Sequence, residues 1–189
     1  MSEKPILFNT EMVRAILDGR KTQTRRIIKP SFHMEQIDGE LFFEDHWGEY
    51  LEAKDVSLIR KGDTLWVRET VAFEDGLKHA KQMWAMGQSV EYYFKTDCSP
   101  ETGWTPSIHM PKCVARIFLK VTNVRIERVQ DISLYDAQHE GCPLTDTNNF
   151  VISPIVWFQQ LWDSINDKRG YGWDKNPWVW VYDFEVVNL

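Results

Sequence analysis

The chain has 189 residues, enough for one domain with a substantial core, and 13% of them are aromatic, which favours a strand-rich fold. Its net charge of −6 argues against sequence-independent coating of nucleic acid. No apolar run approaches the ~20 residues that cross a bilayer, and residues 1–10 lack the layout of a secretory signal, so no membrane partner is expected. The three cysteines form no C-x-x-C pair and the five histidines are scattered, so we expect reduced thiols, a cytoplasmic location, no metal and no other cofactor.

The first predicted elements are a short strand and a helix. Residues 6–8 are apolar and indicate a strand. The stretch "NTEMVRAILDG" predicts a helix with Thr10 as its N-cap and Gly19 as the left-handed residue that ends it. Lys21 then follows a helix C-terminus, where a cation is favoured, and residues 22–28 are expected to be extended.

The middle of the chain alternates expected strands with two irregular segments. Residues 31–60 are polar and acidic with turn signals, which predicts an insertion or lid. Residues 65–69 indicate a strand after a Gly-Asp turn, and residues 74–111 are expected to be a second, irregular insertion with one strand-like piece, "EYYFK". Residues 114–129 give the strongest strand signal of the chain.

Two short helices and a long strand are predicted in the C-terminal third. In "DISLYDAQHEGCP", Ser133 can cap a helix and Asp136 can complete a capping box. In "SPIVWFQQLWDSIN", Pro154 takes the first position of a second helix. Residues 177–187 predict a long strand, in which the aromatic side chains occupy every second position and therefore lie on one face. Short helices among several strands predict an α+β domain around a small barrel.

Positive charge is concentrated near the N-terminus. Residues 1–29 hold seven Lys or Arg against three acids, whereas residues 30–189 hold fifteen against twenty-five. Four of the nine residues in "DGRKTQTRR" (18–26) are basic. This asymmetry predicts a local patch that faces an anionic or polar ligand, and a solvated loop is the alternative.

Lys21 and Thr24 are the first candidates for chemistry. If Lys21 lies in the turn after the helix, its amine and the Thr24 hydroxyl can converge, whereas in a fully extended strand they lie on opposite faces. A lysine acts as the base for a hydroxyl nucleophile only after losing its proton, and burial can lower its pKa from ~10.4 to ~5–6. The alternative is an exposed cation beside an ordinary strand threonine.

Glu140 is the second candidate. It stands in the last turn of its predicted helix, where the helix dipole disfavours a carboxylate, and four residues after the like charge of Asp136. We therefore expect a nearby cation to compensate it. The alternative is a solvated glutamate at a frayed helix end.

Arginine and tryptophan side chains form a third group. Guanidinium groups such as those of Arg25, Arg26 and Arg68 suit phosphates and base edges, and Trp66 could stack on a base. The alternative is that these arginines pair with surface acids and that Trp66 lies in the core. The sequence has no Gly-rich phosphate loop, no Ser-His-Asp order and no acidic metal cluster.

The stretch "GRKTQTRR" resembles the G-x-K-x-x-E-x-R signature of the ASCH superfamily. Gly19, Lys21 and Arg26 fall on the motif, and Thr24 stands where the general pattern has Glu. The branch of small N4-acetylcytidine amidohydrolases is similar in having G-R-K-T-x-T-x-R at this place. Over nearly its full length the chain also resembles phage and prophage ASCH-like proteins, through "ILDGRKTQTRR", "GDTLWVRET" and "DISLYDAQHEG".

The fold that the resemblance implies is a single ASCH domain over residues 1–189, built as a PUA-like small β-barrel with flanking short helices. The insertions at about 31–60 and 74–111 would decorate this domain.

The resemblance also implies an activity. In the amidohydrolase branch the catalytic set is the Lys and Thr of the motif with a later Glu, so Lys21 and Thr24 take the first two places and Glu140 is the expected third. The implied function is a hydrolase that cleaves the exocyclic amide of an N4-acylated cytidine-type substrate, with a nucleoside or single-stranded nucleic acid as partner. The side chains expected to contact this substrate are basic or aromatic: Arg20, Arg25, Arg26, Arg68 and Trp66. The alternative is a non-catalytic RNA- or DNA-binding module, or a ribonuclease, that uses the same basic pocket.

Overall fold

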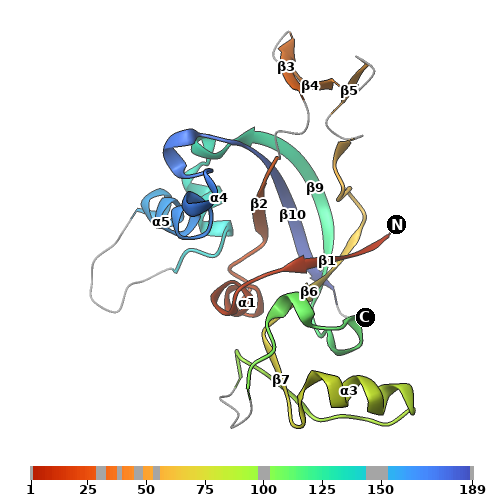
Figure 1. Cartoon of the computed structure of the whole chain (residues 1–189). Helices are drawn as coiled ribbons and strands as arrows, with labels where there is room; N and C mark the ends of the chain where they lie inside the picture. The colour runs from red at the N-terminus through yellow and green to blue at the C-terminus, as the bar shows by residue number, and fades with distance from the viewer. Residues whose placement is uncertain are drawn as a thin grey trace. The chain divides into compact units, whose positions relative to one another are not determined.

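The computed structural model describes residues 2–28, 33–37, 40–44, 49–52, 56–97, 103–143 and 153–187 (Figure 1). These residues form a mixed α and β structure with short helices. The chain divides into two compact units. Unit 1 consists of Met1–Gly19, Thr64–Lys120 and Val186–Leu189, and unit 2 consists of Arg20–Asp63 and Val121–Glu185. The expectation of a single domain stays a prediction.

Unit 1 combines short strands with two helices. Its elements are β1 (Glu3–Leu7), α1 (Thr10–Leu17), β6 (Thr64–Arg68), β7 (Val71–Phe73), α3 (Gly76–Ala85) and β8 (Tyr92–Phe94). Strand β1 runs parallel to β6, and β7 runs antiparallel to β8. One of its core clusters consists of the buried residues Val71, Phe73, Ala80, Phe94, Met110 and Val114. Helix α3 corrects the expectation that the 74–111 segment is irregular.

Unit 2 contains further strands and helices, besides most of the two long strands described below. Its elements are β2 (Gln23–Ile27), β3 (His33–Ile37), β4 (Glu40–Glu44), β5 (Tyr50–Glu52), α4 (Leu134–His139) and α5 (Pro154–Asn166). Strands β3, β4 and β5 form an antiparallel three-stranded sheet within the predicted insertion at 31–60, parts of which lie outside the described residues.

Two long strands, β9 (Phe118–Arg128) and β10 (Trp178–Val187), complete the main sheet. Its hydrogen-bonded order is β1-β6-β9-β10-β2, in which β6–β9 and β10–β2 are antiparallel. Strands β1 and β2 are the edges of this sheet, so across the residues that the structure covers it is open. The predicted closed PUA-like barrel is therefore not confirmed, whereas the mixed α+β class is.

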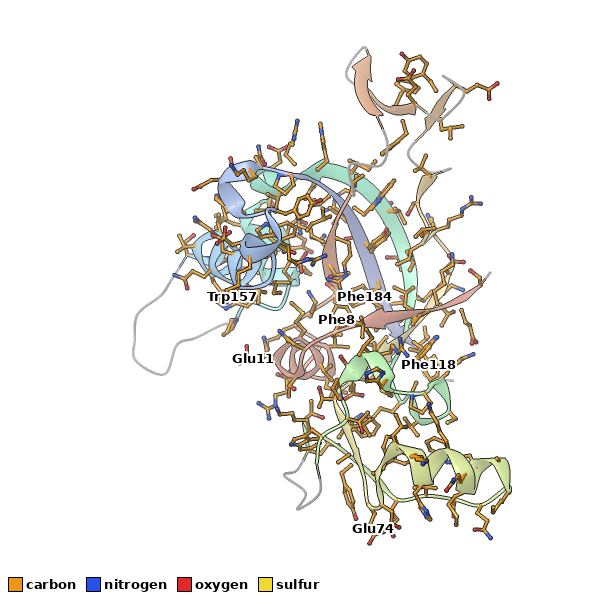
Figure 2. All side chains as sticks on the ribbon, viewed as in Figure 1. Phe8, Glu11, Glu74, Phe118, Trp157 and Phe184 are labelled. Atoms are coloured by element: carbon orange, nitrogen blue, oxygen red, sulfur yellow. The ribbon has the colours of Figure 1, made fainter. Side chains whose placement is uncertain are left out.

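Strand β10 is buried on both of its faces. Val179 and Val181 pack with Phe158 and Trp162 of α5, and the alternate residue Trp180 stacks on Phe43, with 5.7 Å between the ring centroids. Figure 1 shows α4 and α5 together on one side of β2 and β10. In Figure 2 the label Trp157 marks α5, whose half-buried side chains add to this core. The core thus holds β2 and α4 against each other, and these two elements carry the candidate site.

Local signals placed several helix ends. Ser133 caps α4 by accepting a hydrogen bond from the Asp136 N–H, and Pro154 is the first residue of α5, as predicted. Gly19 adopts the left-handed conformation after α1, with φ +72°. The N-cap of α1 is Asn9, whose side chain accepts from the Met12 N–H, so the prediction of Thr10 was wrong by one residue.

Candidate active site

The turn after α1 brings Lys21 to the C-terminal end of α4. Helix α1 ends at Leu17, Gly19 reverses the chain, and Lys21 forms a single antiparallel bridge to Glu140 before β2 begins. The neighbouring Thr22 N–H donates to the His139 carbonyl at 2.9 Å. Backbone pairing therefore fixes Lys21 and Glu140 side by side, although 119 positions separate them in the sequence.

The Lys21 side chain is completely buried, with 0% of its surface exposed. Its Nζ donates to Glu140 Oε2 at 2.6 Å, to the Glu140 carbonyl at 2.9 Å and to the Gln23 carbonyl at 2.8 Å. An ammonium group has three N–H donors, so these three oxygens satisfy all of them. The cation expected near Glu140, at the C-cap of α4, is therefore present.

Burial lowers the pKa of Lys21 below its ordinary value of 10.5, because the charged amine loses its hydration. The Glu140 carboxylate opposes this change, by its charge and by its hydrogen bond. The positive charges of Arg26 and Arg25 reinforce the lowering. The site therefore shifts Lys21 toward the neutral amine that a general base requires.

Arg25 supplies a second cation to the same carboxylate. Its Nη1 donates to Glu140 Oε1 at 3.1 Å and to Gln23 Oε1 at 2.5 Å. Its Nε donates to Glu127 Oε1 at 2.9 Å, and Nη2 bonds the same oxygen. Each oxygen of Glu140 thus faces a different cation.

The ion pairs continue from Arg25 toward the surface. Arg125, which is 31% exposed, donates to Glu127 Oε2 at 3.3 Å, to Asp183 Oδ2 at 2.8 Å and to Asp136 Oδ1 at 3.1 Å. The Gln23 side-chain amide also donates to Asp136 and Asp183. These residues form one network on the face of β2 that α4 covers.

Thr24 lies on the opposite face of β2. Side chains alternate along a strand, so Thr24 faces away from Gln23 and Arg25 and shares its face with Tyr182, its register partner on β10. Thr24 is only 1% exposed, and its hydroxyl has no hydrogen-bond partner within the described parts of the chain.

The predicted substrate contacts divide between the two units. Arg20 donates to the Gly141 carbonyl at 2.6 Å, next to Glu140, and half-buried Arg26 lies on the Thr24 face of β2. Arg68 and Trp66 belong to unit 1, where the Arg68 Cζ lies 5.1 Å from the centre of the Trp66 ring. Hydrogen bonds in unit 2 therefore bring Lys21, Glu140 and Arg25 together, with Arg20 beside them. Thr24 belongs to the same unit but faces away from Arg25, and the convergence of its hydroxyl with the Lys21 amine stays a prediction.

Sequence reasoning missed the acidic partners of Arg25. Arg125 and Glu127 are two residues apart in β9, so they share one strand face, which begins with the apolar residues Leu119 and Val121. Charged residues on a covered strand face need partners, and this signal could have pointed to an ion-pair network. Gln23 and Arg25 are likewise two residues apart, so they share one face of β2.

Other site types find little support in the described residues. Over these ranges no three His, Cys, Asp or Glu side chains gather as metal ligands would. No helix in the described ranges has both the length and the apolar character to cross a bilayer. Cys113 and Cys142 are free thiols, and Cys98 lies outside the described residues.

Comparisons with known proteins give two structural matches. No protein family and no curated protein matches the sequence. One similar solved structure, described as hypothetical protein PH0355, is 10% identical, with a TM-score of 0.45 over 99% of this chain and 100% of its own. Another, an ASCH domain from Lactobacillus crispatus, is 12% identical, with a TM-score of 0.47 over 100% of this chain and 81% of its own. At these identities, function has to be argued from the residues.

The lowered pKa of Lys21 predicts a pH-dependent stability. Between that lowered pKa and 10.5 the unfolded chain binds a proton that the native chain does not, so the free energy of unfolding rises with pH in this window, by at most about 1.4 kcal/mol per pH unit. Urea unfolding should show this rise in the native chain relative to Lys21→Met. Parallel pH curves for the two proteins would contradict the lowered pKa.

Proposed function

We propose that this protein is an amidohydrolase that removes the acyl group from the exocyclic amine of an N4-acylated cytidine-type nucleoside. The observation that carries the proposal is the completely buried amine of Lys21, bonded to Glu140 at 2.6 Å and three residues from the buried Thr24. A buried lysine with a lowered pKa is a candidate general base, and the proposal assigns the Thr24 hydroxyl to it as the nucleophile. The ASCH resemblance of the motif supplies the substrate class.

In the proposed reaction, neutral Lys21 accepts the proton of the Thr24 hydroxyl while the oxygen attacks the amide carbonyl carbon. The tetrahedral intermediate collapses as the carbon–nitrogen bond breaks, and the Lys21 ammonium returns the proton to the leaving exocyclic nitrogen. Water then hydrolyses the acyl-Thr24 ester, which releases the carboxylic acid and restores the hydroxyl. Glu140 orients Lys21 throughout.

A single-step route would use the same residues in other roles. Glu140 would activate a water for direct attack on the amide, and Lys21 would stabilise the oxyanion. Thr24→Val separates the two routes, because valine keeps the shape of threonine but lacks the hydroxyl. We expect this variant to lose deacylation and the wild type to accumulate an acylated Thr24 detectable by mass spectrometry; full activity in the variant would favour the single-step route.

The proposal is tested by incubating the purified protein with N4-acetylcytidine and following the release of cytidine. The rate should hardly change between about 50 and 200 mM salt, because the substrate is neutral. Absence of cytidine from N4-acetylcytidine and from longer N4-acyl analogues would refute the proposal.

Non-catalytic binding of nucleic acid has less support. Phosphate recognition needs accessible cations, whereas the charges of Lys21 and Arg25 already face Glu140 and Glu127. Phosphate-led binding would also weaken steeply over the same salt range. A fluorescent single-stranded RNA therefore serves as the second ligand in the salt titration.

A further inference from the structure

We propose that Arg25 is a positioning residue of this site: it holds one oxygen of Glu140, so that the other oxygen is presented to Lys21. The inference rests on the proposed function, and it gives Arg25 a role different from the substrate contact that the sequence predicted. The inference is based on the two oxygens of the Glu140 carboxylate, which bond different cations: Oε1 lies 3.1 Å from Arg25 Nη1, and Oε2 lies 2.6 Å from Lys21 Nζ.

The guanidinium of Arg25 is held rigidly. It donates four hydrogen bonds, to Glu127, Gln23 and Glu140, and the Arg25 side chain is 1% exposed. Its Cζ lies 5.6 Å from the centre of the Phe158 ring, at a distance where cation and ring attract. A planar guanidinium held in this way determines where the oxygens that accept its hydrogen bonds lie.

The partners of Arg25 are themselves anchored. Arg125 donates to the second oxygen of Glu127 at 3.3 Å, and Asp136 Oδ2 lies 3.6 Å from Arg25 Nη2. Gln23, which accepts from Arg25, donates its amide to Asp136 and Asp183. Rotation of Arg25 away from Glu140 would break several of these contacts at once.

The arrangement has a consequence for the protonation of Lys21. The charged groups facing Lys21 are Glu140, Arg25 and Arg26, of which only Glu140 raises the pKa of Lys21. Removing Arg25 would take away a positive charge and free both Glu140 oxygens to approach the amine. Both changes raise the pKa of Lys21, so less neutral amine is present at a given pH. The acidic limb of the rate profile should then move to higher pH.

The test compares Arg25→Gln with Arg116→Gln. Arg116 also pairs with a buried carboxylate, Glu69, at 3.0 Å, but it lies in unit 1 and contacts neither Lys21 nor Glu140. For kcat/KM against N4-acetylcytidine, we expect Arg25→Gln to shift the acidic limb upward by about one pH unit, with activity recovering at alkaline pH. Arg116→Gln should leave the pH of the acidic limb unchanged. Arg25→Lys keeps the charge, so its acidic limb should lie close to that of the wild type.

A uniform loss of rate in Arg25→Gln, with an unmoved acidic limb, would overturn the positioning role. If this variant does not fold, the double variant Arg25→Gln with Glu127→Gln removes the ion pair as a unit and should show the same shift. NMR titration of the Lys21 side chain gives a readout without turnover. An upward pKa shift in Arg25→Gln supports the inference even if no N4-acyl substrate is hydrolysed, and an unchanged pKa overturns it.

Discussion

Replacing Lys21 with methionine is expected to lower kcat/KM for N4-acetylcytidine by at least about 100-fold, the lower range of contributions from general acid–base catalysis. Methionine matches the length of the lysine stem but has neither a proton acceptor nor a charge. The fold should persist, because the Glu140 carboxylate keeps its ion pair with Arg25 at 3.1 Å. The measurement is initial rates together with a thermal unfolding curve for each protein.

Lys175→Met is the matched control for this experiment, because Lys175 is exposed and lies outside the site. Its rate should equal that of the wild type. If Lys21→Met retained wild-type turnover with an intact fold, the amine would have no part in the chemistry and the proposed mechanism would fall.

Replacing Glu140 with glutamine is expected to have the largest effect on stability. Glu140 is the carboxylate shared by two buried cations, Lys21 and Arg25, and removing one partner of a buried pair costs about 3–5 kcal/mol. The loss should be smaller at high pH, because Lys21 can give up its proton there and Arg25 cannot. Urea unfolding at several pH values measures both the size of the loss and its pH dependence.

Glu185→Gln provides the comparison, since Glu185 is exposed on β10 and such surface changes usually stay within about 0.5 kcal/mol. An equally small effect for Glu140→Gln would mean that Glu140 behaves as a solvated helix-end residue. The Lys21–Glu140 pair would then contribute nothing to the native state, and the positioning of Lys21 would need another explanation.

Local chemistry explains which parts of the fold could be predicted. The Ser133 cap and Pro154 act within a few residues of themselves, and the alternation of residues 178–187 needs only the strand period. Helix α3 was missed because its signals are weak: its N-cap Asp75 makes no capping bond, and Ala80 is its one buried residue. The openness of the main sheet depends on long-range pairing, which no local pattern encodes.

The sequence by itself determined the chemical groups of the site: a lysine and a hydroxyl close together in one motif, and a helix-end carboxylate that required a cation. The tertiary structure decided which cations pair with this carboxylate. Lys21 and Arg25 lie more than one hundred positions from Glu140, and only the bridge from Lys21 to Glu140 and the packing of α4 beside β2 bring them within 3.1 Å. The charges lie so far apart along the chain that residue spacing carries no information on their pairing. The free energy of burying them selects the partners, because a buried charge without one is too costly to persist.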